Sequence, residues 1–232
     1  MAFTHVTGYA NLSLQGFSWT FTLNFTPTPG NLVCVAISLG VLAAASSMTV
    51  TDSNNNSYTV TPHSPSSFIS GTGAVWLFYL LAAPSNATNV LHVAWVSTSN
   101  KDAAIGWAEE FSYSGTCFFD KDTSASSSID HTTINTPSIT PTKANSLLYA
   151  CASVGGTVTH PKANATLGAW TGSQGDITGG DMAEYDLNAS ATTSVDFTQT
   201  PTQKWSAMAM AFYTQPTANP SGSWMFFGVG NT

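Results

Sequence analysis

The chain contains no arginine, and its basic side chains are five lysines scattered among 232 residues. Asp and Glu together number 12, the formal net charge is −7, and charged residues make up 7% of the sequence. An average soluble protein has about 25% charged residues. Nucleic-acid binding requires clustered cations that displace condensed counterions from phosphates. The charge content therefore excludes nucleic acid as a partner.

Long hydrophobic runs are also missing. The longest apolar run, 74–83, is about half of the roughly 20 residues that a membrane-spanning helix needs. The first residues, 1–5, show neither the basic region nor the apolar region of a signal peptide. We therefore expect no membrane span, and either use of the protein without Sec export or removal of a leader. Aromatic residues make up 12% of the chain, which gives too much surface to bury for a disordered protein.

Cysteine is scarce, with three residues in the whole chain. Cys34 and Cys151 lie in apolar runs, whereas Cys117 lies near a turn. The spacing predicts two buried free thiols and one partly exposed thiol, and leaves a Cys34–Cys151 bridge open. No Cys-x-x-Cys or Cys/His spacing indicates zinc, and no cofactor is expected.

What the sequence does contain is a series of strand patterns. Residues 17–25 alternate apolar and polar side chains, as a strand with one buried face does. Residues 32–37 form a continuous apolar run, typical of a strand covered on both faces. Segments 48–51 and 58–61 flank a polar loop and predict a hairpin. Further strands are expected at 74–82, 89–97, 104–113, 145–153, 181–187, 193–199 and 204–214. Because amphipathic helix patterns are almost absent, we predict an all-β, antiparallel β-sandwich of the jelly-roll or immunoglobulin-like type.

Three pairs of segments resemble each other in the same order along the chain. Residues 27–38 resemble 141–153, residues 79–96 resemble 185–197, and residues 107–113 resemble 205–213. We interpret this as a pseudo-duplicated strand set, about 27–115 and 141–214, within one sandwich domain of residues 1–214. The Ser/Thr-rich segment 121–142 is predicted to be an exposed connection between the copies. Residues 215–232 are predicted to be a linker and an aromatic tail.

Some of these stretches resemble a known group of proteins. The chain carries Gly30-Asn31 followed by an apolar strand, Val50-Thr-Asp52-Ser-Asn-Asn-Asn-Ser-Tyr58-Thr, and Glu110-Phe-Ser-Tyr-Ser-Gly115. It is similar over about 27–153 to a loosely defined family of phage-encoded and bacterial surface β-sandwich proteins, which carry GNLLVVAVS, VTDSNGNTYT and EYSG stretches. These motifs are turns and core strands, so the resemblance implies a fold and no catalytic residue.

Two acidic segments contain residue types that can bind calcium. The segment from Asp52 to Ser57 matches the opening of a calcium loop, but it has Ser57 where the loop needs Gly and His63 where it needs Glu. An Asn-rich hairpin turn held by side-chain to backbone bonds is the favoured interpretation. A second acidic group lies in a Gly-rich stretch and fits a solvated edge equally well: Asp176, Asp181, Glu184 and Asp186. No metal site is therefore predicted.

Enzyme chemistry is not favoured either. Glycoside hydrolysis needs two carboxylates flanking the bond, and Glu109 and Glu110 are neighbours that point to opposite faces of a strand. Glu110 with Glu184 remains a weak alternative. No G-x-S-x-G elbow is present, and no histidine lies in a recognisable catalytic context. We expect no enzyme activity and no catalytic residues.

A second interpretation is a carbohydrate-binding module. Exposed Trp and Tyr side chains can stack on sugar rings while Asn and Asp bind the hydroxyls. Trp170, in a loop-like segment, is the best candidate, with Asp176 and Asp181 near it in sequence. The other tryptophans outside the tail are expected in the core: Trp19, Trp76, Trp95, Trp107 and Trp205.

The favoured interpretation is a structural protein of a virion or an extracellular surface, such as a phage decoration, fibre or tail component. Its expected partners are copies of itself or other virion or surface proteins, with glycans as the alternative. Residues 215–223 form a Pro-punctuated linker that leads to Trp224, Met225, Phe226 and Phe227. Such an aromatic tail could add to the open sheet edge of a neighbour, or form the last strand of its own sandwich.

Overall fold

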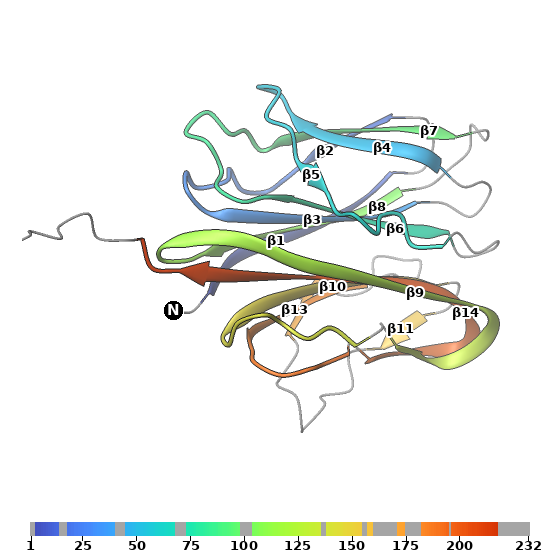
Figure 1. Cartoon of the computed structure of the whole chain (residues 1–232). Helices are drawn as coiled ribbons and strands as arrows, with labels where there is room; N and C mark the ends of the chain where they lie inside the picture. Colours follow the sequence, from blue (N-terminus) through green and yellow to red (C-terminus); the bar gives the residue numbers. More distant parts are fainter. Residues whose placement is uncertain are drawn as a thin grey trace, which may run out of the picture.

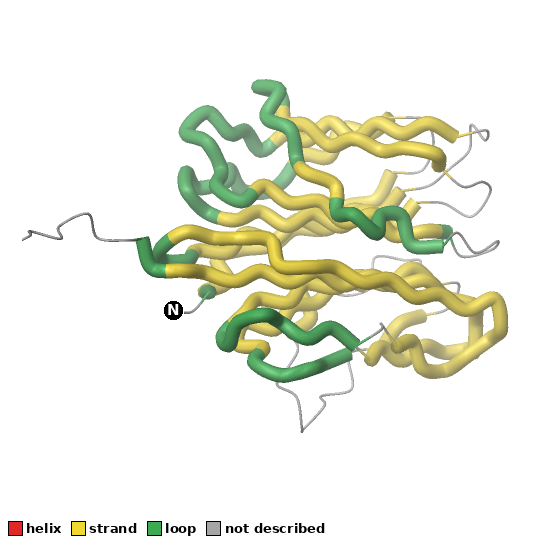
Figure 2. The backbone as a smooth tube through the Cα atoms, in the orientation of Figure 1, coloured by secondary structure: helices red, strands yellow, loops and turns green. Residues whose placement is uncertain are grey.

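The computed structural model describes residues 3–13, 18–39, 45–67, 73–97, 104–135, 138–154, 157–159, 171–174, 182–194 and 196–217. These residues form fourteen strands and no helix (Figure 2). Every strand pairing among them is antiparallel. The predicted all-β, antiparallel fold is therefore confirmed. Within the described ranges, no helix is long and apolar enough to cross a membrane.

The middle sheet contains five strands in the order β1-β8-β3-β6-β5. Their bounds are β1 Thr4–Ser13, β8 Ala104–Ser112, β3 Leu32–Leu39, β6 Ala74–Leu80 and β5 Thr59–Val60. All eight residues of β3 are buried. The continuous apolar run at 32–37 had predicted such a strand, because both of its faces must be covered.

The first outer sheet contains three strands in the order β2-β7-β4. Their bounds are β2 Ser18–Thr22, β7 Val90–Ser97 and β4 Ala45–Asp52. In β2, Phe21 is fully buried, whereas Ser18, Thr20 and Thr22 are exposed. The alternation read from the sequence thus assigns the apolar side chains to the core and the hydroxyls to solvent.

The second outer sheet has the order β11-β14-β10-β13-β12, with β9 paired to β14. The strand bounds are β9 Thr116–Asn135, β10 Ser146–Val154, β11 Thr157–Thr159, β12 Thr171–Gln174, β13 Met182–Ala189 and β14 Asp196–Gln215. Residues 121–142 were predicted to be an exposed connection. Residues 128–133 are exposed as predicted, whereas 121–127 are half-buried or buried, and residues 121–135 belong to a strand. This segment is strand β9, which pairs with β14 through the backbone and needs few apolar side chains to do so.

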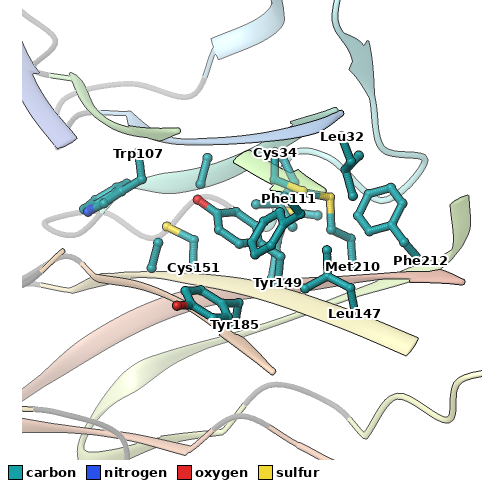
Figure 3. Close-up of a cluster of buried hydrophobic side chains, with 14 of the residues drawn as sticks. Leu32, Cys34, Trp107, Phe111, Leu147, Tyr149, Cys151, Tyr185, Met210 and Phe212 are labelled. Carbon is teal, nitrogen blue, oxygen red and sulfur yellow. The ribbon is translucent and has the colours of Figure 1, made fainter. Parts of the chain in front are cut away.

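The three sheets stack as layers, with the middle sheet enclosed by the two outer ones (Figure 1). One apolar cluster, which we call the first interface, joins the middle sheet to the first outer sheet. Another, the second interface, joins the middle sheet to the second outer sheet (Figure 3). A simple sandwich has two sheets, whereas this chain adds a third and buries both faces of the sheet between them.

The strands that resembled each other in sequence hold equivalent positions in two sheets. In the middle sheet, β3 lies between β8 and β6, and in the second outer sheet β10 lies between β14 and β13. The segments that the sequence comparison matched include these three pairs: β3 with β10, β8 with β14, and the end of β6 with the middle of β13. A duplication of the strand set stays a prediction.

Candidate functional site

The polar loop after β4 is organised around the side chain of Asp52. Its Oδ1 accepts hydrogen bonds from the backbone N–H groups of Asn54 and Asn56, each at 2.9 Å. Its Oδ2 accepts from the Asn56 side-chain amide at 2.8 Å and from the Thr88 backbone N–H at 2.9 Å. The carboxylate is 1% exposed and all four contacts come from N–H donors. It therefore has the environment of a turn anchor.

This arrangement decides between the two interpretations of the Asp52–Ser57 segment. Burial alone would raise the pKa of Asp52, but the hydrogen bonds from Asn56, Thr88 and Asn54 outweigh it and hold the pKa below its ordinary value. Among the residues that the structure describes, no group of three or more His, Cys, Asp or Glu side chains is placed to hold a metal ion. The hairpin-turn interpretation is the one that the contacts support.

Glu110 plays a similar part on the middle sheet. It is 1% exposed, and its Oε1 accepts hydrogen bonds from the Thr28 backbone N–H at 2.9 Å and from the Asn31 side-chain amide at 2.6 Å. Residues 28–31 form the turn that leads into β3, and Gly30 takes a positive φ of 88° there. Glu110 therefore fixes the entry to the most buried strand.

Asp122 connects two sheets. This residue of β9 is 8% exposed and accepts a hydrogen bond at 2.7 Å from the backbone N–H of His63, which follows β5. Its other oxygen lies 2.7 Å from Nδ1 of the same histidine, whose ring is largely exposed. The pair holds the loop after β5 against the long edge strand of the second outer sheet.

Glu109 is fully buried and faces the second interface from β8. Its carboxylate contacts Nε2 of His5, and the His5 ring stacks on Tyr185 at 4.6 Å between ring centroids. The glutamate leans across β1 over Gly8, where an added Cβ would lie 2.1 Å from both carboxylate oxygens. Glycine is therefore required at position 8 for the Glu109–His5 contact to form.

The three thiols lie together in the same interface. Cys34, Cys117 and Cys151 are free and buried, and all three belong to one apolar cluster. Figure 3 shows Cys34 and Cys151 in this cluster. Burial raises the pKa of Cys117 to about 12, and burial with the nearby Cys117 and Glu109 raises that of Cys34 as well. The prediction that Cys117 is partly exposed was wrong, because β9 turns this side chain inward.

Strand β9 is the outer edge of its sheet. Its described backbone pairs with β14 along Thr116–Ser127 and again near Asn135, and no other described strand pairs with it. We call Thr116–Ser127 the open edge. Two aromatic pairs flank its start on opposite faces: Phe118 stacks on Tyr213 at 5.3 Å, and Phe119 stacks on Tyr79 at 5.0 Å. All four rings are half-buried.

Several residues singled out from the sequence lie outside the described part of the chain. They are the carbohydrate candidates Trp170, Asp176 and Asp181 and the tail residues Trp224, Met225, Phe226 and Phe227. Glu184 is described as backbone within β13, opposite Ala150 of β10. Four of the five tryptophans expected in the core are at most 7% exposed, and Trp19 is half-buried against Phe21.

The Glu109–His5 contact and the open edge could not be read from the sequence. The first depends on the register that sets β1 against β8, which brings Gly8 beside Glu109. The second depends on which strand ends a sheet. The alternation of residues 204–214 did predict the strand that pairs with β9.

Comparison with known proteins gives little to add to these features. No family model matches the chain, and no curated protein matches it. One similar solved structure is a chain from the atomic structure of Sulfolobus Turreted Icosahedral Virus, with 11% sequence identity and a TM-score of 0.32. The match covers 91% of this chain and 92% of that one.

Proposed function

We propose that this protein is a non-enzymatic structural component of a virion or an extracellular assembly, in which copies of the chain associate through their sheets. The observation that carries the proposal is the open edge. Twelve residues of β9, Thr116–Ser127, pair with a strand on one side and with no described strand on the other. Natural proteins cover or blunt long edges, because an unpaired row of N–H and C=O groups attracts another strand.

The use of the buried polar side chains supports the same proposal. Asp52, Glu110 and Asp122 each accept hydrogen bonds from loop backbone and so hold the loops against the sheets. His92 is bonded to the Ser53 hydroxyl at 3.1 Å on the exposed face of the first outer sheet. These groups stabilise the framework, which is the role that a structural protein requires of them.

The surface chemistry fits association with copies. On the first outer sheet, the exposed side chains of β2 are Ser18, Thr20 and Thr22. Few charges oppose the approach of one such surface to another, since only 7% of the chain is charged. Low charge density favours association between like molecules.

The test is the state of the purified full chain in solution. Sedimentation and negative-stain electron microscopy over a wide concentration range should show a discrete oligomer or a regular array. A chain that stays monomeric at every concentration and adds to no particle would contradict the proposal. A glycan array on the same sample tests the carbohydrate-binding alternative, for which selective binding of one sugar class is the positive outcome.

A further inference from the structure

We propose that the open edge of β9 accepts the aromatic tail segment 224–229 of a second copy as an added antiparallel strand. This inference rests on the proposed function and names the partner at that edge. The supporting observations are that β9 pairs on one side, that aromatic rings lie at its start, that the tail is uncharged, and that β14 ends beside the first residue of β9.

The edge is accessible to a strand along its length. Among the described residues, the backbone groups of Thr116–Ser127 bond to β14, and no loop backbone bonds to them. The neighbouring loops reach β9 through its side chains: Thr142 bonds to the Asp120 carboxylate, and His63 bonds to Asp122. Both contacts are made by side chains of β9 and do not use the backbone groups that would pair with an incoming strand.

The aromatic rings at the start of β9 match the composition of the tail. Phe118 and Phe119 point to opposite faces of the sheet. Phe118 is half-buried against Tyr213, and Phe119 is half-buried against Tyr79 and Phe212. A strand formed by 224–229 would likewise place Trp224 and Phe226 on one face and Met225 and Phe227 on the other. Cross-strand aromatic pairs stabilise a sheet, so both faces of the added strand would gain contacts.

Charge also favours the tail as the occupant. Residues 215–232 contain no Asp, Glu, Lys or Arg, so the net charge of −7 belongs entirely to residues 1–214. An uncharged segment therefore adds no charge repulsion when it approaches an acidic neighbour.

The position of β14 points to a second copy. Its last residue, Gln215, pairs with Thr116, the first residue of β9. A tail that turned back onto its own β9 directly after Gln215 would therefore run parallel to it, whereas the tail of another copy can approach antiparallel. Antiparallel pairs are the more stable per residue. Residues 216–223 provide a spacer that spans at most about 29 Å when extended, enough to leave one body and reach another.

The first experiment removes the tail. A variant ending at Thr217 should sediment as a monomer under conditions in which the full chain is oligomeric, with at least a tenfold weaker association. As a matched control, Trp224, Met225, Phe226 and Phe227 are replaced by Ser in the full-length chain, which should lose association to the same degree. If both variants assemble like the parent, the tail inference is overturned while the proposed function stands. If the parent itself never assembles, the proposed function fails.

The second experiment separates exchange between copies from a tail folded onto its own body. Thr116→Cys is made in one protein and a single cysteine at 224, 225, 226 or 227 in another, and the two are mixed and oxidised. A disulfide-linked heterodimer for at least one tail position supports the inference, because neither variant carries both new thiols. Crosslinking seen only when both cysteines are in one chain, with the product a monomer, would overturn it.

The third experiment alters the acceptor. Phe118→Lys places a charge beside the open edge and should weaken binding of a labelled peptide of residues 218–232 to the Thr217 truncation by at least tenfold. Tyr9→Lys on the edge strand β1 is the control for a lysine near an edge aromatic, and should bind the peptide like the parent. Unfolding curves of both variants verify that each is folded. Equal binding by the two variants, or no binding by the truncation itself, would contradict the assignment of β9.

Discussion

The two interfaces that enclose the middle sheet differ in their sulfur-containing and polar side chains, and β3 shows the contrast within one strand. Its residues Val33, Val35, Ile37 and Leu39 face the first interface. Leu32, Cys34 and Ala36 face the second. On that second side, the hydroxyl of Ser38 donates a hydrogen bond of 2.8 Å to Ser153 of β10. Branched aliphatic groups thus fill one side of the strand, and mostly small, sulfur-containing or polar groups fill the other.

The contrast extends across the layers. Both interfaces contain Phe, Leu, Ile, Val and Trp side chains. The first has one methionine, Met48, whereas the second has two methionines, three thiols and the Glu109–His5 contact. The stability of an aliphatic core depends little on which apolar side chains are in contact, but it falls when buried volume is removed. Buried polar groups depend on one particular partner. The first interface should therefore respond most to changes of size, and the second to changes of hydrogen bonding.

The largest effect is expected from loss of volume in the first interface. Ile37→Ala should lower the free energy of unfolding by about 2–5 kcal/mol, because it deletes fully buried carbons and leaves a cavity. Cys34→Ala on the other face of β3 removes one sulfur and should lower it by about 1 kcal/mol. Urea unfolding of both variants measures the difference. Equal losses would show that the two interfaces do not differ in this respect.

Two buried aspartates should respond in opposite directions. Asp52→Asn should lower the free energy of unfolding at pH 7 by about 1–3 kcal/mol, since it weakens hydrogen bonds to a buried carboxylate. Asp186 of β13 has one oxygen without a partner, and burial raises its pKa, despite the bond from the Asn188 N–H. Asp186→Asn should therefore leave stability unchanged or raise it.

The pH dependence of the same two residues gives an independent check. The folded pKa of Asp52 is lower than the unfolded one, so its contribution is present above the ordinary value of 3.8 and is lost as pH falls. The folded pKa of Asp186 is higher, so its contribution is present below 3.8 and is lost as pH rises. Unfolding curves measured from acid to neutral pH give the free energy of unfolding against pH. The slope that each aspartate contributes should be absent from its Asn variant. Slopes of the same sign for both would contradict the assignment.

The serine pair tests the second interface on a smaller scale. Ser38→Ala should lower the free energy of unfolding by about 0.5–1.5 kcal/mol through loss of the bond to Ser153. A double-mutant cycle with Ser153→Ala isolates the coupling of the two hydroxyls. A coupling energy of zero would mean that the bond contributes nothing across the layers.

The smallest effect is expected when a thiol reagent is added to the folded protein. With the pKa of Cys117 at about 12 and that of Cys34 also raised, almost no thiolate is present near pH 8. A thiol reagent should label the native protein negligibly and label three cysteines once it is unfolded. Rapid labelling of Cys117 in the native state would show that the second interface opens at β9.

The sequence predicts those parts of the fold in which side chains alone determine the structure. The continuous run of β3, the alternation of β2 and the hairpin around Asp52 all follow from which residues must be buried. The alternation at 204–214 likewise predicts a strand, now the second half of β14, with Ala207, Ala209 and Ala211 on its outer face.

The missed features depend on pairing rather than on composition. Strand β9 is held by backbone hydrogen bonds to β14, so few of its side chains need to be apolar. Its sequence is therefore rich in Ser and Thr and resembles that of a connecting loop. The contact between His5 and Glu109 depends on the register of β1, including the irregularity between His5 and Thr7. No local pattern in one segment records the register of another. The tail and the Trp170 region were named from the sequence, and their structure lies outside the described residues.

The position of β3 in the middle of the middle sheet has a consequence for hydrogen exchange. Its amides are bonded within a strand that is buried on both faces and flanked by β8 and β6. They can exchange with solvent only when the layers separate, so their exchange rates should report the global free energy of unfolding. Amides of β2 and β4, at the edges of the first outer sheet, should exchange through smaller openings. The difference between the two rates would measure how far that sheet can detach while the middle sheet stays folded.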